Sequence, residues 1–352
     1  MSPSVPLSGI PALPCSAADH YEFKLVGEGA SNVVFEVVVQ PNDESSSSIF
    51  QGNLLRVPKA GTKAHTYVEL QEYWEAVVKP LFEPEDLVQH RLVHLGGEQL
   101  VLRLNAVLAK NEDIRRPDFR GSRVAAAEYG MLVEDMRQRQ PNDLTLEFKP
   151  KWLAQSPNAP PSATRCRNCA REALKHHTKH TNHRDSPPIL CPLDFLTCAT
   201  SPAAFTRIAD HLCSLNPLIP SPKTTHPAQY SRLLYWLQTN TVLPRLRAAQ
   251  LDNDGQGPLQ ADAHDPKFQL AMTLRDCTCF IRVPYDPALP VEAKLADLDK
   301  KNWAAKLGYW QAMERRLIEG GYYEGREAVK VRTDCQLERG IVNESTDQRE
   351  GS

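Results

Sequence analysis

The sequence predicts an α+β protein with two lobes, an antiparallel sheet in the N-terminal lobe and a larger mixed C-terminal lobe. The chain has 352 residues, 41% hydrophobic and 24% charged, which is ordinary for a globular protein and sufficient for one large domain or two lobes. Residues 21–39 are typical of a strand, a glycine turn and a second strand, and residues 54–59 of a third strand. Apolar residues recur at helical spacing in 203–213, 229–248 and 309–318.

These patterns divide the chain into four regions. We expect the N-terminal lobe at 19–137 and the C-terminal lobe at 138–330. A loose tail rich in proline and serine occupies 1–18, and a polar tail occupies 331–352.

Composition excludes several classes of partner. The formal net charge is -2, so there is no general basic field for nucleic acid, and any anion site must be a local cluster. No apolar run approaches the length of a membrane span, and we see no signal-peptide segment, so we expect no membrane partner. The nine cysteines are an odd number and form no regular framework. We therefore expect reduced thiols in an intracellular protein.

The glycine turn is the first candidate for ligand binding. Gly27 and Gly29 allow a tight turn and close approach of the backbone to a ligand, and backbone N–H groups in such a turn can hold phosphate oxygens. Most glycine hairpins are nevertheless only hairpins, and Arg56, near the end of the third strand, is on its own equally typical of a solvated cation. Strand, glycine turn, strand, loop and cation-bearing strand together form the layout of a kinase N-terminal lobe.

Other segments of this lobe are predicted from periodicity. Residues 65–78 are helical with core aromatics, and residues 100–108 are expected to form a strand. Residues 129–136 form an apolar strand that runs into acidic residues. In a two-lobed kinase such a strand leads into the connection between lobes, whose backbone hydrogen-bonds adenine. The basic loop at 114–120 could hold an anion or simply be solvated.

Lys149 and Lys151 follow an alternating apolar stretch, Leu144-Thr-Leu-Glu-Phe148. The two lysines have the same parity, so if the strand continues both point to one side, with Pro150 between them. Two ammonium groups fixed side by side repel each other unless an anion lies between them. Lysine and proline are also common at edge strands, and this stretch alone favours that structural explanation.

Residues 165–175 have strong helix formers, with cations at Arg167, Arg171 and Lys175. These positions are spaced i, i+4 and i+8, so we expect the three side chains on one face. Like charges at this spacing are destabilising on an isolated helix. The pattern therefore indicates an anionic partner, although a solvated face would also explain it.

Cys166 and Cys169 form a Cys-x-x-Cys pair, followed by four histidines, at positions 176, 177, 180 and 183. Two thiolates and two imidazoles are suitable zinc ligands. Against zinc, these residues lie partly on one predicted helix, so the chain would have to reverse to build a tetrahedron.

Two carboxylates are candidates for a metal. We expect residues 268–283 to form strand, turn and strand, with Asp276 at the corner, and Asp297 follows after one loop. A carboxylate between apolar strands is a plausible metal ligand, and its structural alternative is an aspartate that caps a turn.

Taken in order, these motifs resemble one family. The segments are Gly-Glu-Gly-Ala-Ser-Asn-Val-Val-Phe (27–35), Leu-Leu-Arg-Val-Pro-Lys (54–59), Glu-Phe-Lys-Pro-Lys (147–151), Cys-Pro-Leu-Asp (191–194), Leu-Arg-Asp-Cys-Thr (274–278) and Asp-Leu-Asp-Lys-Lys (297–301) before Tyr309-Trp310. They resemble motifs of the inositol-pentakisphosphate 2-kinases, particularly the fungal branch, and they run from about residue 25 to about residue 320.

The resemblance implies a two-lobed kinase related to inositol polyphosphate kinases, a monomer located in the nucleus, the cytoplasm or both. Its reaction would transfer the γ-phosphate of ATP, with Mg²⁺, to the 2-hydroxyl of inositol 1,3,4,5,6-pentakisphosphate, giving inositol hexakisphosphate. The alternatives are a non-catalytic module that binds an inositol phosphate or a phosphopeptide, or an inositol phosphate kinase with another substrate preference.

The same resemblance implies roles for individual residues. Those expected at the nucleotide are Gly27, Gly29, Asn32, Arg56, Glu134 and Met136. Those expected at the inositol phosphates are Lys149, Lys151, Arg167, Arg171, Lys175, Lys301, Lys306 and Arg116. Asp276 and Asp297 would hold magnesium, Asp276 would also accept the proton of the 2-hydroxyl, and Lys149 would assist catalysis.

Overall fold

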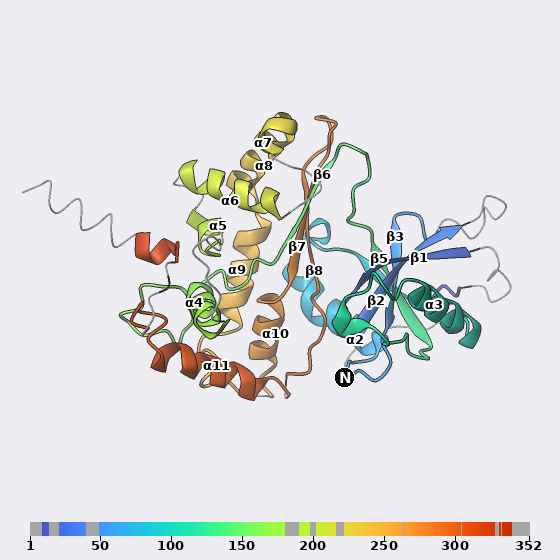
Figure 1. The fold of residues 1–352 in the computed structure, drawn as a ribbon, viewed down its shortest axis with the longest axis horizontal. Helices are drawn as coiled ribbons and strands as arrows, with labels where there is room; N and C mark the ends of the chain where they lie inside the picture. Colours follow the sequence, from blue (N-terminus) through green and yellow to red (C-terminus); the bar gives the residue numbers. More distant parts are fainter. Residues whose placement is uncertain are drawn as a thin grey trace, which may run out of the picture. The chain divides into compact units, whose positions relative to one another are not determined.

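The computed structural model describes residues 9–13, 21–39, 49–179, 190–197, 202–215, 222–262, 264–303, 305–327, 331 and 333–339. Within them the chain forms two compact units. Unit 1 comprises residues 1–137 and 299–302, and unit 2 comprises residues 138–298 and 303–352. The protein is a mixture of helices and antiparallel sheets, as the α+β prediction requires (Figure 1).

Unit 1 contains a five-stranded antiparallel sheet. Its strands, in the order β1-β2-β3-β5-β4, are β1 (Tyr21–Glu28), β2 (Asn32–Val39), β3 (Asn53–Pro58), β5 (Tyr129–Glu134) and β4 (His90–His94). Buried side chains alternate along β1 and β2, so these strands turn one set of side chains into the apolar cluster under the sheet. The register shifts between Leu25 and Gly27, directly before the glycine turn.

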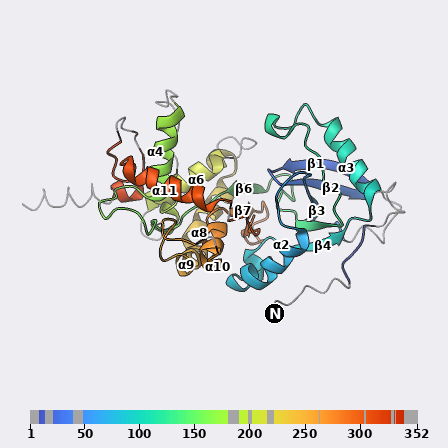
Figure 2. The ribbon, with the colours of Figure 1, turned by 90° about the horizontal axis from the view of Figure 1, so that it is seen from below.

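Two helices cover opposite faces of this sheet (Figure 2). Helix α2 (Tyr67–Tyr73) begins with a capping box between Thr66 and Glu69 and continues into a π-helical turn, Trp74–Val78. Single 3₁₀ turns follow at Lys79–Leu81, Pro84–Asp86 and Pro117–Phe119. Helix α3 (Glu98–Lys110) covers the other face.

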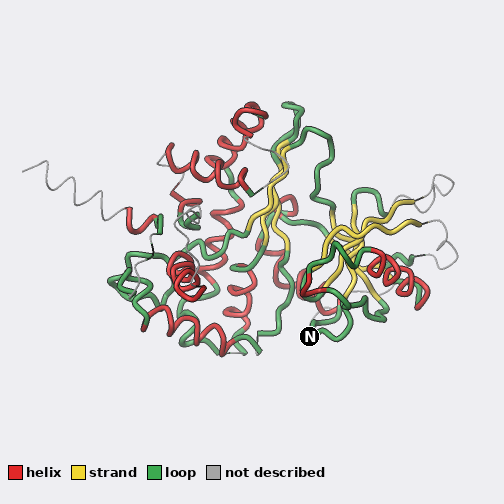
Figure 3. The backbone as a smooth tube through the Cα atoms, in the orientation of Figure 1, coloured by secondary structure: helices red, strands yellow, loops and turns green. Residues whose placement is uncertain are grey.

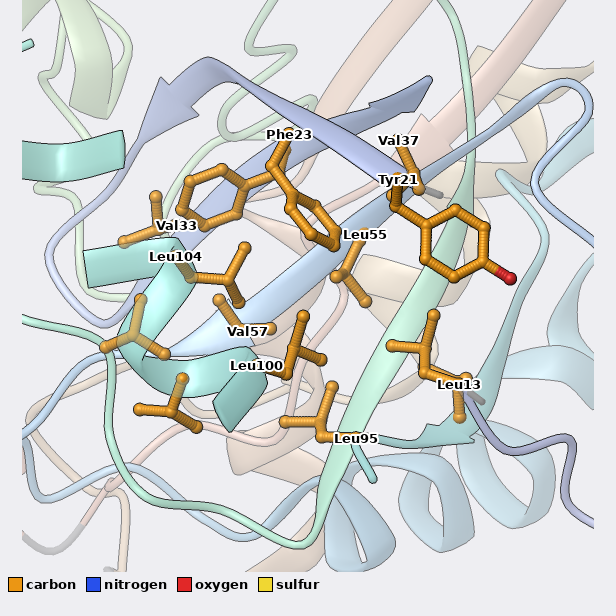
Figure 4. Packing of buried hydrophobic residues seen from close by; sticks show 14 of the residues in the cluster. Leu13, Tyr21, Phe23, Val33, Val37, Leu55, Val57, Leu95, Leu100 and Leu104 are labelled. Atoms are coloured by element: carbon orange, nitrogen blue, oxygen red, sulfur yellow. The ribbon is translucent and has the colours of Figure 1, made fainter. Parts of the chain in front are cut away.

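The expectation of a strand at 100–108 is wrong, because this segment lies within α3. The buried residues Leu100, Val101, Leu104 and Leu108 follow the helical period, not the period of two. Figure 4 shows Leu100 and Leu104 in the apolar cluster that also contains Val33 and Leu55 of the sheet. Helix α3 therefore packs its apolar face against the strands that flank the glycine turn.

Unit 2 is mostly helical around a three-stranded antiparallel sheet (Figure 3). The strands, in the order β6-β7-β8, are β6 (Leu144–Phe148), β7 (Thr278–Val283) and β8 (Glu292–Ala296). The described helices are α4 (Arg167–Lys179), α5 (Asp194–Thr197), α6 (Pro202–Ser214), α7 (Pro222–Thr225), α8 (Pro227–Thr239), α9 (Val242–Asp252), α10 (Pro266–Leu274) and α11 (Leu307–Glu319).

Two expectations for unit 2 need correction. Residues 268–274 belong to helix α10 and not to a strand, so Asp276 lies between a helix and β7. Residues 333–339, which fall in the predicted polar tail, include a fully buried cysteine, Cys335. No helix among the described residues is long and apolar enough to cross a membrane.

Candidate active site

Three chain segments meet at one end of the sheet of unit 2. Phe148 pairs with Cys279, and Thr278 pairs with Ala296. The residues just after β6, just before β7 and just after β8 therefore lie at the same end of the sheet. These residues are Lys149, Asp276 and Asp297. The strand register therefore explains why groups far apart in the sequence come together.

Lys149 lies between the two carboxylates. Its Nζ is 3.0 Å from Oδ2 of Asp297 and 3.6 Å from Oδ1 of Asp276, and it donates a hydrogen bond of 2.7 Å to the backbone carbonyl of Asp276. Nζ of Lys151 lies 3.5 Å from Oδ1 of Asp276. All four side chains are between 35% and 47% exposed, so the group is open to a ligand.

The backbone of this group has an unusual conformation at two positions. Lys151 has a φ of 61° and Asp297 a φ of 57°, and they are the only non-glycine residues with positive φ in the described part of the chain. Left-handed backbone costs free energy for residues with a side chain, and such residues cluster at functional sites. The left-handed backbone at Lys151 also shows that strand β6 does not continue through the two lysines. Their equal parity therefore does not determine the side on which their side chains lie. Both reach the same carboxylate because the chain bends after β6, which ends at Phe148.

The surroundings shift the pKa values of Lys149 and Lys151 in opposite directions. Burial alone would lower the pKa of Lys149, but Asp297 and Asp276 more than offset it and the pKa is raised. Burial also lowers the pKa of Lys151, where Asp276 compensates less and the charges of Lys149 and Arg171 lower it further. Lys151 thus lies among other cations in the free protein, which is the environment that an anionic ligand would relieve.

Helix α4 contributes its cations unequally. Arg171 is half-buried and its charge acts on Lys151, so it belongs to the group above. Lys175 is exposed and paired with Glu172 one turn away. Arg167 is buried, lies 2.6 Å from the fully buried Glu314, and covers the ring of Trp152. The three cations expected on one helix face therefore lie in different surroundings, and Glu314 neutralises the charge of Arg167 inside the unit.

The environment of Asp276 also differs from the expectation. The carboxylate is not buried between two apolar strands but about half exposed, with lysines as compensating charges. Asp276 and Asp297 still form an oxygen donor set suited to Mg²⁺, which proteins bind through one or two carboxylates together with substrate phosphates. The residues present therefore fit the metal that the sequence led us to expect.

The glycine turn of unit 1 leaves space above its backbone. A Cβ built on Gly27 would meet nothing within 4 Å, and one on Gly29 would meet only the backbone oxygen of Asn32, at 3.9 Å. Neither glycine has a positive φ. The fold itself thus requires no glycine at these two positions, which is consistent with close approach by a ligand.

Below this turn lies a buried ion network that sequence reasoning missed. Glu28 accepts hydrogen bonds from Arg115 at 2.7 and 2.9 Å and pairs with Lys59 at 2.6 Å. Burial alone would raise the pKa of Glu28, but Arg115 and Lys59 lower it to about 2. Arg115, and not Arg116, is therefore the structural cation of the basic loop. Arg116 remains 71% exposed beside Asp118.

Arg56 is oriented by a partner that the sequence did not reveal. It forms a two-point ion pair with Asp299, and Nη1 lies 3.1 Å from Oδ1. Burial would raise the pKa of Asp299, but the charge of Arg56 lowers it. In the orientation that satisfies its amide, Asn32 donates a hydrogen bond of 2.8 Å to the hydroxyl of Tyr67 and accepts one of 2.6 Å from Arg56, whose guanidinium lies over the ring of Tyr67. Arg56, Asn32 and Asp299 therefore form one connected group in unit 1.

The predicted adenine contacts lie at the end of β5. The amide of Glu134 donates to the carbonyl of Gln89 at 2.8 Å, and its carboxylate accepts from the amide of Gln89 at 3.2 Å. Met136 is buried. Two other predicted substrate contacts are now located: Lys301 is half-buried in unit 1, and Lys306 is exposed in unit 2, directly before α11.

Comparison with known proteins identifies the family. Residues 26–316 match the family described as inositol-pentakisphosphate 2-kinase. The chain is 27% identical to the inositol-pentakisphosphate 2-kinase of Yarrowia lipolytica over 339 residues, covering 90% of this chain and 96% of that protein. It is 33% identical to the inositol-pentakisphosphate 2-kinase of Eremothecium gossypii over 181 residues, covering 49% of this chain and 53% of that protein. This chain therefore belongs to the inositol-pentakisphosphate 2-kinase family.

Proposed function

We propose that this protein transfers the γ-phosphate of ATP to the 2-hydroxyl of inositol 1,3,4,5,6-pentakisphosphate and so produces inositol hexakisphosphate. Membership in the family supports this activity. The observation that carries it to particular residues is the group of Lys149, Lys151, Asp276 and Asp297 at one edge of the sheet of unit 2. Five phosphate monoesters carry roughly -7.5 to -10 charges, and only a local cluster of cations can bind such an anion.

The roles follow from the position of each group. Lys151 and Arg171 bind phosphates of the substrate, because they are adjacent cations that repel each other in the free protein. Lys149 holds the phosphoryl group in transfer, since its neighbours keep it charged. Asp276 accepts the proton of the 2-hydroxyl. Magnesium held by Asp276 and Asp297 would neutralise charge on the ATP phosphates.

Unit 1 carries the residues that we assign to the nucleotide. The open glycine turn at Gly27 and Gly29 accommodates phosphates, and Arg56 is held in place by Asp299 to bind them. Among the described residues, none accepts a hydrogen bond from the backbone amide of Met136, which makes this amide a candidate for adenine. We infer that units 1 and 2 are the nucleotide and substrate lobes of a kinase-like fold, and that the enzyme works inside the cell.

A product assay tests the activity. The purified protein is incubated with magnesium-ATP and a panel of inositol phosphates that differ in the position of the free hydroxyl. We expect conversion of the 1,3,4,5,6-pentakisphosphate to the hexakisphosphate, and no conversion when magnesium is removed. Faster conversion of another isomer would instead indicate a kinase of different preference. Binding without any conversion would indicate a non-catalytic module.

A further inference from the structure

Gln250 is a buried polar residue on the apolar face of helix α9. It is 1% exposed. The other buried residues of this helix are all apolar: Val242, Leu243, Leu246 and Ala249. A side-chain amide is costly to bury unless its hydrogen-bonding groups find partners, whereas a methionine or a leucine could fill similar space without that cost. The proposed activity uses no residue of α9, so this amide needs its own explanation.

Three hydrogen bonds satisfy the amide of Gln250, and all three go to backbone groups. Nε2 donates to the carbonyl of Lys151 at 2.9 Å and to the carbonyl of Leu274 at 3.3 Å. Oε1 accepts from the backbone amide of Leu153 at 3.0 Å. Both donors of the side chain are therefore used. The opposite orientation of the amide would turn its oxygen toward two carbonyl oxygens, so only one orientation satisfies these contacts.

Two of these contacts hold the backbone on either side of Trp152. The carbonyl of Lys151 precedes this residue and the amide of Leu153 follows it, so the side chain of Gln250 pairs with the stretch as a backbone peptide group would. Lys151 has a φ of 61°, a conformation that costs free energy and persists only where the surroundings hold it. Gln250 supplies such a restraint, and it thereby fixes the direction in which the Lys151 side chain leaves the backbone.

The third contact ties the same amide to the end of helix α10. Leu274 is the last residue of this helix, so its carbonyl has no partner within the helix, and it lies two residues before Asp276. Trp152 reinforces the connection. Its ring packs against the buried face of α10 and lies under the guanidinium of Arg275, 3.5 Å from the ring centre. Gln250 and Trp152 thus join the segment that carries Lys151 to the segment that carries Asp276.

We propose that Gln250 is a positioning residue for phosphoryl transfer, which holds Lys151 in register with Asp276. Nζ of Lys151 lies 3.5 Å from Oδ1 of Asp276, and Gln250 acts on this pair through the backbone of the two segments without touching either side chain. This inference rests on the proposed function, because it takes Lys151 as a substrate ligand and Asp276 as the proton acceptor. Misplacing reacting groups by about 1 Å can cost about 10²-fold in rate, so a buried restraint of this kind has a measurable effect.

A cycle of variants tests whether Gln250 acts through Lys151. Gln250→Met keeps the length of the side chain and removes all three hydrogen bonds. Calorimetry measures the Kd for inositol 1,3,4,5,6-pentakisphosphate in the wild type, in Gln250→Met, in Lys151→Met and in the double variant. We expect Gln250→Met to weaken binding about tenfold, but to weaken it less than about twofold further when Lys151 is already replaced. A residue that only supports the fold would contribute its full effect in both backgrounds.

Kinetics separate the same two explanations. Gln250→Met should lower kcat by about 10²-fold and leave the KM for ATP unchanged, because we assign the nucleotide to residues of unit 1. Gln229→Met is the matched control. Gln229 is 3% exposed on α8, and its Nε2 donates a bond of 3.0 Å to the carbonyl of Asn142, before β6 and at the opposite end of that strand from Lys149. This variant should also lower the melting temperature but should keep the wild-type Kd and kcat.

Three results would overturn the proposal: unchanged Kd and kcat in Gln250→Met, additive losses in the double variant, or an equal loss of kcat in Gln229→Met at an equal loss of melting temperature. If Gln250→Met does not fold, Gln250→Asn takes its place in the cycle, because its shorter amide does not reach both segments. Loss of the fold in both variants would make Gln250 a residue of overall stability and would also overturn the proposal.

The cycle distinguishes this inference from the proposed function. If Lys151→Met by itself leaves the Kd unchanged, the substrate role of Lys151 is wrong, and the inference about Gln250 is wrong with it. If Lys151→Met weakens binding while Gln250→Met does not, the proposed function stands and only the inference about Gln250 is wrong.

Discussion

Replacing Asp276 with asparagine should lower the turnover far more than the stability of the protein. The substitution keeps the shape of the side chain and removes its charge. Asp276 faces Lys151 at 3.5 Å and Lys149 at 3.6 Å, and its side chain is 47% exposed. Exposed ion pairs contribute about 0.2–1 kcal/mol each, so losing two should cost about 0.4–2 kcal/mol of unfolding free energy. In a unit of this size, that lowers the melting temperature by roughly 2–4 °C per kcal/mol.

The effect on turnover should be far larger. If Asp276 accepts the proton of the 2-hydroxyl, removing its carboxylate lowers kcat by about 10²–10⁴-fold. The loss of a magnesium ligand lowers kcat further. Substrate binding should be retained or tightened, because one negative charge near the phosphates is gone.

Calorimetry for binding, a product assay for kcat and thermal unfolding measure the three quantities on one preparation. Asp286→Asn is a matched control. Asp286 is exposed on the loop between β7 and β8, beyond the opposite end of β7, and the variant should behave as wild type. Normal turnover by Asp276→Asn, or a folded variant that no longer binds substrate, would show that the assigned role is wrong.

Three further predictions concern other groups. Lys151→Met should weaken substrate binding by about 1.5–3 kcal/mol, roughly 10- to 150-fold in Kd, with unchanged stability. The reason is that this lysine lies among other cations in the free protein. Calorimetry measures the affinity, and an unchanged Kd would count against the substrate role. Arg167→Met should lower the unfolding free energy by about 3–5 kcal/mol in denaturant titrations, since it leaves the charge of Glu314 buried without its cation. A drop in substrate affinity without loss of stability would instead restore Arg167 as a substrate ligand. Burial lowers the pKa of His90 from 6.5 to about 4. Its contribution to the free energy of unfolding, about 3 kcal/mol, is therefore complete above pH 6.5 and is lost as the pH falls towards 4. His90→Asn should therefore flatten the acid side of the stability profile, and an equally steep profile in the variant would refute this assignment.

Secondary structure could be predicted from the sequence where one face of an element is exposed. The alternation in β1 and β2 and the helical period in α2 and α6 were sufficient, because a half-buried element shows its period. Residues 268–274 do not show it, since nearly all of them are buried in α10. A continuous apolar run fits a buried strand and a buried helix equally well, which is why this segment was assigned wrongly.

Long-range partners could not be predicted for a different reason. The Cys-x-x-Cys pair at 166 and 169 was visible in the sequence, but the structure buries it beside Cys191, from a separate turn, and Cys335, from the C-terminal segment. Nothing in the local pattern relates these positions, because only the packing of α4 brings them together. The same holds for Asp299, whose pairing with Arg56 spans 243 positions of the chain.

The sequence also gives no means of deciding which cations are available to a ligand, and burial supplies that distinction. Arg167 and Arg275 are each buried with one carboxylate, from Glu314 and Asp254, so their charges are neutralised within the unit. At one end of the sheet, by contrast, two partly exposed cations, Lys149 and Lys151, face two carboxylates, Asp276 and Asp297, and the charge of the half-buried Arg171 acts on Lys151. Three positive charges against two negative ones leave an excess of one, which Mg²⁺ would raise to three. A bound anion would offset this excess, and a polyphosphate has enough charge and enough oxygen acceptors to meet both the cations and the metal.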